Sequence, residues 1–169
     1  MRYPCLSSRS QEAVTAGLHA VAMICHQRGL QFTENRVMVM ETLLQAEHPM
    51  RAYELLEVLA SRLERTISPP TVYRALEFLL QHGFISRIET TNAYTPITQP
   101  DHDQSCFFLI CETCGSLAEI ENAQLEAMFE QDAAVLGFRI GKRVIELQGT
   151  CADCQTAEAT VGLNLESIE

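Results

Sequence analysis

The sequence predicts an α+β chain in two parts: helices that end in a β-hairpin, then strands and one helix closed by a metal ion. Three observations carry this prediction. Apolar residues in 11–83 recur with the helical period, and those in 84–97 recur with the period of two that strands show. Two Cys-x-x-Cys pairs lie in the second part. With 169 residues the chain can form two small domains, which we place at 1–97 and 98–169.

Four helices are predicted in the first part, each from an apolar stripe and its end signals. They span 11–28 (ended by Gly29), 33–46 (begun by Thr33), about 51–63, and 68–82 (begun by Ser68 and Pro69 and ended by Gly83). Cys25 lies on the apolar stripe of the first helix and is expected in the core. Residues 1–10, which include Cys5, are expected to lack regular structure.

After the fourth helix the spacing of apolar residues changes from the helical period to the period of two that strands show. Strands are predicted at 84–89 and 93–97, with a turn between them, and prolines at 96 and 100 mark a linker. Beyond it we expect strands at 106–111 and 117–120, a helix at 123–136 and a strand at 138–148. Residues 155–169 are acidic and weakly patterned, which indicates a tail or a short final strand.

Helices followed by a hairpin are the order of a winged helix-turn-helix, and the fourth helix is the predicted DNA reader. Its buried stripe centres on Val72, so Arg74 faces the opposite side and Tyr73 lies at the edge. Arginine suits guanine edges and phosphates in the major groove. The helix start from Ser68 to Thr71 is expected to leave backbone N–H groups free for a phosphate. A plain helical bundle with a solvated polar face remains the alternative.

The charge divides along the same boundary. Residues 1–95 are neutral, whereas residues 96–169 carry the whole net charge of −10. A neutral, arginine-bearing first part can present a basic face to DNA, and an acidic second part would point away from phosphates. The alternative is that the acidic residues only keep the protein soluble, which would explain the net charge of the chain equally well.

The cysteine pairs Cys111/Cys114 and Cys151/Cys154 have the spacing of two zinc knuckles. Four thiolates fill a zinc tetrahedron and leave no open position, so the pattern predicts one structural zinc rather than a catalytic one. Disulfides or a redox motif are the alternatives, but residues 1–30 show no signal-peptide pattern. We therefore expect a cytoplasmic protein without a membrane span.

The stretch Pro69-Pro-Thr-Val-Tyr-Arg-Ala-Leu-Glu-Phe-Leu79 and the Cys111-x-x-Cys114-Gly115 knuckle resemble the ferric-uptake-regulator family of bacterial metal-responsive repressors. Thr91-Asn92-Ala93-Tyr94 resembles its zinc-uptake branch. The resemblance implies a homodimer, a C-terminal α/β dimerisation domain, and zinc-dependent repression of uptake genes through operator DNA. It also implies that Tyr53 and Arg74 contact DNA.

The chain departs from that family where metal sensing is expected. Ser86 stands where the zinc-uptake branch commonly has a histidine, and Ile97 where it commonly has a cysteine, whereas Glu119 matches the family's carboxylate ligand. A regulatory zinc could be held by His102, Cys106 and Glu119, with Asp101 or Asp103 as a fourth ligand. The alternative is a solvated linker and a buried strand cysteine.

Several other functions remain open from the sequence. The chain could be a family regulator of another metal or of peroxide stress, or a metal-independent DNA binder. An enzyme built on a zinc ribbon is not expected, because the sequence shows no catalytic triad, phosphate loop or paired-carboxylate motif.

Overall fold

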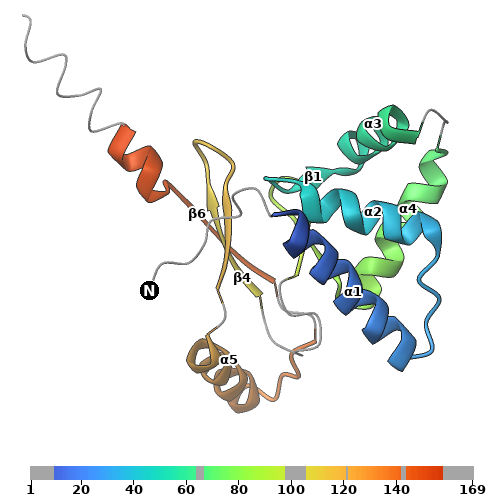
Figure 1. Cartoon of the computed structure of the whole chain (residues 1–169). Helices are drawn as coiled ribbons and strands as arrows, with labels where there is room; N and C mark the ends of the chain where they lie inside the picture. The colour runs from blue at the N-terminus through green and yellow to red at the C-terminus, as the bar shows by residue number, and fades with distance from the viewer. Residues whose placement is uncertain (1–9, 64–66, 98–105, 121, 142–143, 158–169) are drawn as a thin grey trace, which may run out of the picture. The chain divides into compact units, whose positions relative to one another are not determined.

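The computed structural model describes residues 10–63, 67–97, 106–120, 122–141 and 144–157. They form two compact units, one within residues 6–103 and the other from 104 onward (Figure 1). The expectation for residues 1–10 falls almost wholly on residues outside the described ones.

The first unit contains the four helices that the sequence predicts. They are α1 (Gln11–Gln27), α2 (Glu34–Gln45), α3 (Ala52–Leu63) and α4 (Pro69–Gln81). The Ser10 side chain caps α1 by accepting from the Ala13 N–H at 3.3 Å. Gly29 and Gly83 adopt φ of 65° and 74°, and these left-handed conformations end α1 and α4.

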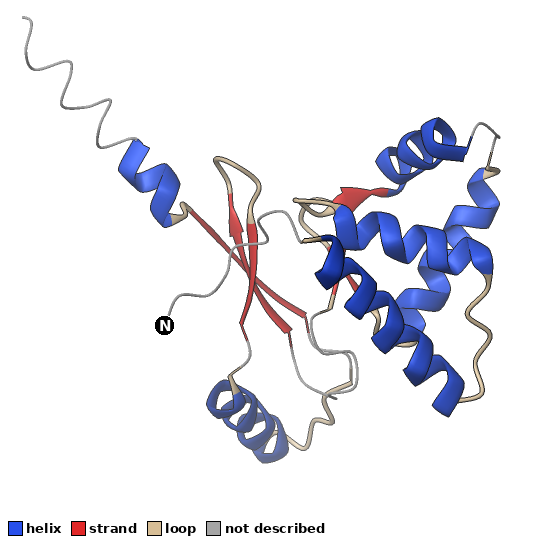
Figure 2. Ribbon diagram, in the orientation of Figure 1, coloured by secondary structure: helices blue, strands red, loops and turns tan. Residues whose placement is uncertain are grey.

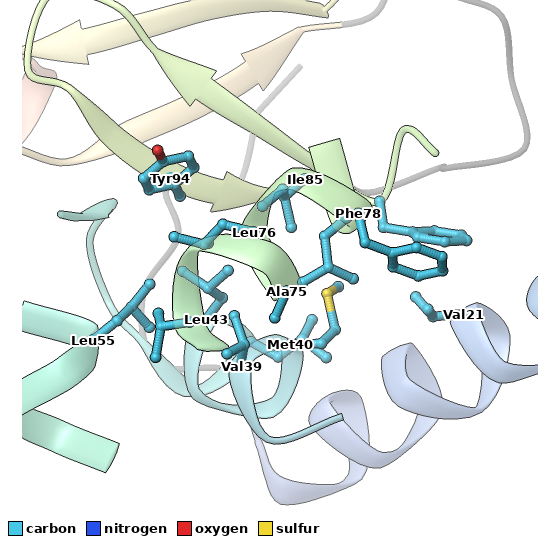
Figure 3. Close-up of a cluster of buried hydrophobic side chains, with 14 of the residues drawn as sticks. Val21, Val39, Met40, Leu43, Leu55, Ala75, Leu76, Phe78, Ile85 and Tyr94 are labelled. Carbon is cyan, nitrogen blue, oxygen red and sulfur yellow. The ribbon is translucent and has the colours of Figure 1, made fainter. Parts of the chain in front are cut away.

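One hydrophobic core joins these helices to the strands that follow. Cys25 lies in it as predicted, and Phe84 and Leu79 are fully buried. Figure 3 shows side chains from the four helices and from the hairpin meeting in this core. The labelled residues are Val21, Val39, Met40, Leu43, Leu55, Ala75, Leu76, Phe78, Ile85 and Tyr94. The core fixes the buried side of α4 and thereby determines which side of that helix faces solvent.

A three-stranded antiparallel sheet forms the wing. The predicted hairpin is present as β2 (Ile85–Ile88) and β3 (Ala93–Pro96), and Asn92 in its turn has a φ of 52°. A third strand, β1 (Met50–Arg51), pairs with the outer side of β3 in the order β1-β3-β2. The sequence did not predict β1, because a two-residue strand has no detectable period.

The second unit contains a three-stranded sheet, one longer helix and a short helix at residues 152–157 (Figure 2). Strand β4 (Cys106–Cys111) lies in the centre, antiparallel to β5 (Leu117–Ile120) and parallel to β6 (Val144–Gly149). Helix α5 (Ala123–Val135) contacts the sheet through Phe129, whose ring stacks on that of Phe107 at 6.3 Å. These elements confirm the predicted α+β class.

Two predictions for this unit need correction. The strand predicted at 138–148 begins only at Val144, because β6 pairs residue by residue with β4 and β4 begins at Cys106. Residues 138–141 have no regular structure, and 142–143 lie outside the described residues. Residues 152–157 form a short helix, so the first residues of the predicted tail are helical; 158–169 lie outside the description. Among the described residues, no helix is long and apolar enough to cross a membrane.

Candidate metal centre and nucleic-acid interface

The first cysteine pair forms a tight turn at the end of β4. Cys111 is the last residue of that strand, and its N–H donates to the Ser116 carbonyl at 2.9 Å. The Gly115 N–H donates back to the Cys111 carbonyl at 2.9 Å, and Gly115 has a φ of 70°. A glycine after Cys114 is needed because this left-handed conformation would strain other side chains.

The second pair reaches the same place because β6 runs parallel to β4. Cys111 is opposite Gly149 in the register, so Cys151 arrives two residues later beside the first knuckle. The Glu112 N–H donates to the Gly149 carbonyl at 2.9 Å and fixes the two strand ends together. Cys154 lies one helical turn further, in the 152–157 helix.

The four sulfur atoms, from Cys111, Cys114, Cys151 and Cys154, all lie within 4.8 Å of one another. The Sγ atoms of Cys114 and Cys151 are 3.8 Å apart. A zinc tetrahedron with Zn–S bonds of about 2.3 Å has edges of about 3.8 Å, so the spacing fits four thiolates around one zinc ion. Every cysteine whose side chain the structure describes is a free thiol, and 3.8 Å is far beyond a disulfide bond of about 2.05 Å.

The groups around the four sulfurs shift the pKa values of individual thiols in different directions. Backbone N–H groups of Cys114 and Cys151 point at Cys111 Sγ and lower the pKa of that thiol to about 6. The Ser116 hydroxyl, 3.1 Å from Cys114 Sγ, lowers the pKa of Cys114. The pKa of Cys154 is raised, first by its contact with Cys151. The thiolate forms of Cys111 and Cys114 are therefore favoured, and a bound divalent cation would favour the ionised form of all four sulfurs.

Helix α4 presents the side chains that the sequence assigned to DNA. Val72, Ala75 and Leu76 are buried, whereas Arg74 is exposed and Tyr73 is 53% accessible. Thr71 is half-buried at the start of the helix. The structure thus brings the three predicted side chains together on one helix.

The predicted phosphate site of free N–H groups at this helix start is wrong. Pro69 and Pro70 have no N–H to offer. The Thr71 N–H donates to the Ser68 carbonyl at 2.9 Å, and the Ser68 hydroxyl lies 2.8 Å from the Thr71 hydroxyl instead of capping the backbone. Pro69, Pro70 and Thr71 therefore offer no free backbone N–H to a phosphate.

A hollow beside α4 was not apparent from the sequence. It has a volume of about 220 Å³ and lies between the start of α2 and the exposed side of α4. Its lining residues are Thr33, Asn35, Arg36, Thr71, Arg74 and Ala75. The predicted reader Arg74 therefore lies in a concave surface rather than on an isolated helix.

Tyr53 lies in the first turn of α3 and is 51% accessible. Its hydroxyl accepts a hydrogen bond from Arg51 Nη1 at 3.3 Å. Arg51 Nε also donates to the Thr91 carbonyl in the wing turn at 3.0 Å. Sequence reasoning missed Arg51 because its role depends on β1, which brings residues 51 and 91 together.

The proposed regulatory ligands are not brought together in the described part of the chain. His102, Asp101 and Asp103 lie outside it, and of Cys106 only the backbone, at the start of β4, is described. Glu119 is half-buried in β5, opposite Phe108 of β4. This site remains a prediction.

The two departures from the family pattern have clear positions in the wing. Ser86 is buried in β2 and pairs in register with Thr95 of β3, which is also buried. Ile97 follows β3, and its N–H donates to the Phe84 carbonyl at 3.1 Å. Neither the Ser86 hydroxyl nor the Ile97 side chain is a ligand that zinc prefers.

The second unit exposes large apolar side chains. The most exposed are Val135 and Leu136, each 82% accessible at the end of α5, and Phe138, 67% accessible. Met128, Phe129 and Leu147 add to this set. Exposed apolar residues in such number on a small unit indicate a protein–protein contact.

A winged helix joined to a sheet with a four-cysteine centre is the architecture of a metal-dependent DNA-binding regulator. Residues 27–148 match the ferric uptake regulator family, and the chain belongs to this family. The chain is 38% identical over 139 residues to the zinc uptake regulation protein of Escherichia coli K12, with 80% of each chain covered. It is 28% identical over 142 residues to the ferric uptake regulation protein of Campylobacter jejuni, covering 82% of this chain and 88% of the relative.

Solved structures give the same result. A zinc uptake regulator in complex with zinc and DNA superposes with a TM-score of 0.81 at 33% identity, covering 89% of this chain and 99% of the other. The holo form of XcZur superposes with a TM-score of 0.76 at 36% identity, and the superposition covers 83% of this chain and 98% of the other. The predicted family is therefore confirmed.

Proposed function

We propose that this protein is a zinc-responsive repressor that binds operator DNA as a homodimer and controls zinc-uptake genes in the cytoplasm. The observation that carries the proposal is the exposed face of α4, with Arg74 and Tyr73. The protein that carries this face aligns over 89% of its length with a zinc uptake regulator whose structure was solved with zinc and DNA. Catalysis is not part of the proposal, because the family consists of DNA-binding regulators.

Residues 1–97 are proposed as the DNA-binding domain and 98–169 as the dimerisation domain. In the first, Arg74 reads a base edge or phosphate, and Thr71, Tyr73 and Tyr53 contact the backbone around it. In the second, Cys111, Cys114, Cys151 and Cys154 hold one structural zinc that keeps the ends of β4 and β6 together. The exposed apolar residues of the second unit would be covered by its copy in the dimer.

A saturated four-thiolate site holds its zinc too firmly to report the zinc level, so the response requires a second, weaker site. We propose His102, Cys106 and Glu119 for it. Zinc there would favour the dimer shape that places both α4 helices in successive major grooves. Ala substitutions of His102 and Glu119 should then flatten the zinc response and leave the structural zinc in place.

A second candidate function is DNA binding that does not depend on added metal. It is favoured by Ser86 and Ile97, which offer no ligand at the two positions where this branch commonly has a histidine and a cysteine. The two functions differ only in whether free zinc changes the operator affinity.

DNA binding itself is tested by recovering duplexes from a random library with the purified protein. Arg74→Ala should weaken binding to the recovered duplex by roughly 5- to 150-fold, because a good arginine–base pair contributes about 1–3 kcal/mol. Arg139→Ala removes the same charge from an exposed position of the second unit and serves as the control. Equal affinities of wild type and Arg74→Ala would exclude α4 as the reader.

A further inference from the structure

Arg51 makes three contacts that together cross from the wing to the start of α3. Its backbone N–H donates to the Glu54 carboxylate at 2.6 Å, within the first turn of α3. Its Nε donates to the Thr91 carbonyl at 3.0 Å, and its Nη1 donates to the Tyr53 hydroxyl at 3.3 Å. One side chain therefore connects two surfaces that are far apart in sequence.

The strand pairing places Arg51 where it can do this. Arg51 is opposite Ala93 in the β1–β3 register, so its backbone is fixed to the strand that follows the wing turn. Asn92, next to Thr91, has a φ of 52°, a conformation that asparagine tolerates but does not prefer. The Arg51 bond to the Thr91 carbonyl helps to hold the turn in this form.

The direction of the bond to Tyr53 matters for binding. A guanidinium can only donate, so the Tyr53 oxygen is the acceptor and its own O–H proton points elsewhere. The hydroxyl can therefore donate this proton in a hydrogen bond to a phosphate oxygen, which is an acceptor. A hydrogen bond received from a cation also polarises the phenol and makes it a stronger donor.

We propose that Arg51 is a positioning residue, which holds the Tyr53 hydroxyl and the wing turn together as one surface that binds the DNA backbone. The proposal rests on the DNA-binding function above and deepens it, since it adds a residue that neither the helix pattern nor the family resemblance identifies. Arg51 acts through Tyr53 and Thr91, not as the main contact to phosphate.

The test is a double-mutant cycle on binding to a duplex recovered from the random library. The proteins are wild type, Arg51→Met, Tyr53→Phe and the double variant, with Arg139→Met, at an exposed position of the second unit, as the control for lost charge. Tyr53→Phe should weaken binding roughly three- to tenfold when Arg51 is present and hardly at all in Arg51→Met, because the two residues act as a unit. Arg51→Lys keeps the charge but has one nitrogen in place of the Nε and Nη1 atoms that reach Thr91 and Tyr53 separately, so it should behave as Arg51→Met does in the cycle.

Several outcomes separate this proposal from its alternatives. If the effects of the two substitutions on binding are additive, and Arg51→Met also reduces the dependence of the binding constant on salt by about one phosphate contact, Arg51 contacts DNA directly. The positioning role is then wrong. If Arg51→Met only lowers the urea midpoint of the first unit and the coupling in DNA binding is absent, the role is structural and the proposal is again wrong. If the wild type recovers no duplex at all, the DNA-binding function fails, and this inference fails with it.

Discussion

Replacing Cys114 with serine removes one thiolate from a cluster whose four sulfur atoms lie within 4.8 Å. A serine hydroxyl stays protonated at neutral pH and does not replace the thiolate as a ligand. Zinc in structural thiolate sites contributes about 10–16 kcal/mol of folding free energy near pH 7. An even share for each of four ligands is about 3 kcal/mol, so the zinc affinity should fall at least about 100-fold.

The second unit has little else to stabilise it. Of the buried hydrophobic residues among the described positions, twenty lie in the first unit, and only Phe107, Phe108, Ile110, Cys111, Leu117 and Ala133 lie in the second. Small units with small cores depend on a metal or a disulfide. Cys114→Ser should therefore unfold the second unit and abolish the dimer, while α1–α4 keep most of the helical signal.

The assay combines zinc counted per chain after dialysis, mass in solution, and far-ultraviolet circular dichroism. Cys25→Ala is the matched control, because it removes a cysteine of the first unit that is buried in the core and lies outside the cluster. We expect about one tightly held zinc in wild type and Cys25→Ala, and almost none in Cys114→Ser. Full zinc content and dimer mass in Cys114→Ser would refute the reasoning.

Three further predictions follow from the geometry. Zinc binding requires the four thiols to be ionised, so zinc counted per chain after dialysis should stay near one at neutral pH and fall as acid protonates the sulfurs; unchanged zinc content in acid would contradict this. Phe84→Ala should lower the free energy of unfolding of the first unit by about 3–5 kcal/mol without changing the zinc content, as urea titration with metal analysis will show. Leu136→Glu, at the residue after α5, should raise the dimer dissociation constant measured by sedimentation, whereas Gln131→Glu, at an exposed position within α5, should not.

Elements with a clear period were predictable, and short or long-range features were not. The four helices and the hairpin follow from apolar stripes and from glycines at their ends. Strand β1 could not be found, since two residues carry no pattern and its partner lies more than forty positions away. The role of Arg51 was hidden for the same reason.

The metal centre shows a similar division. Spacing alone predicted that Cys111, Cys114, Cys151 and Cys154 share one ion, but not why the pairs meet. They meet because β6 lies parallel to β4, and a parallel neighbour cannot be read from either strand by itself. The separation of acidities within the cluster depends on N–H groups and a hydroxyl that only the folded turns bring to the sulfurs.

The most direct test of the proposed function is operator affinity measured against buffered free zinc. The wild-type protein is used with its structural zinc in place and confirmed by metal analysis. A zinc-responsive repressor predicts that affinity rises with free zinc and levels off once a second zinc per chain is bound. An affinity that stays constant while only one zinc per chain is present would contradict zinc sensing and favour the metal-independent DNA binder.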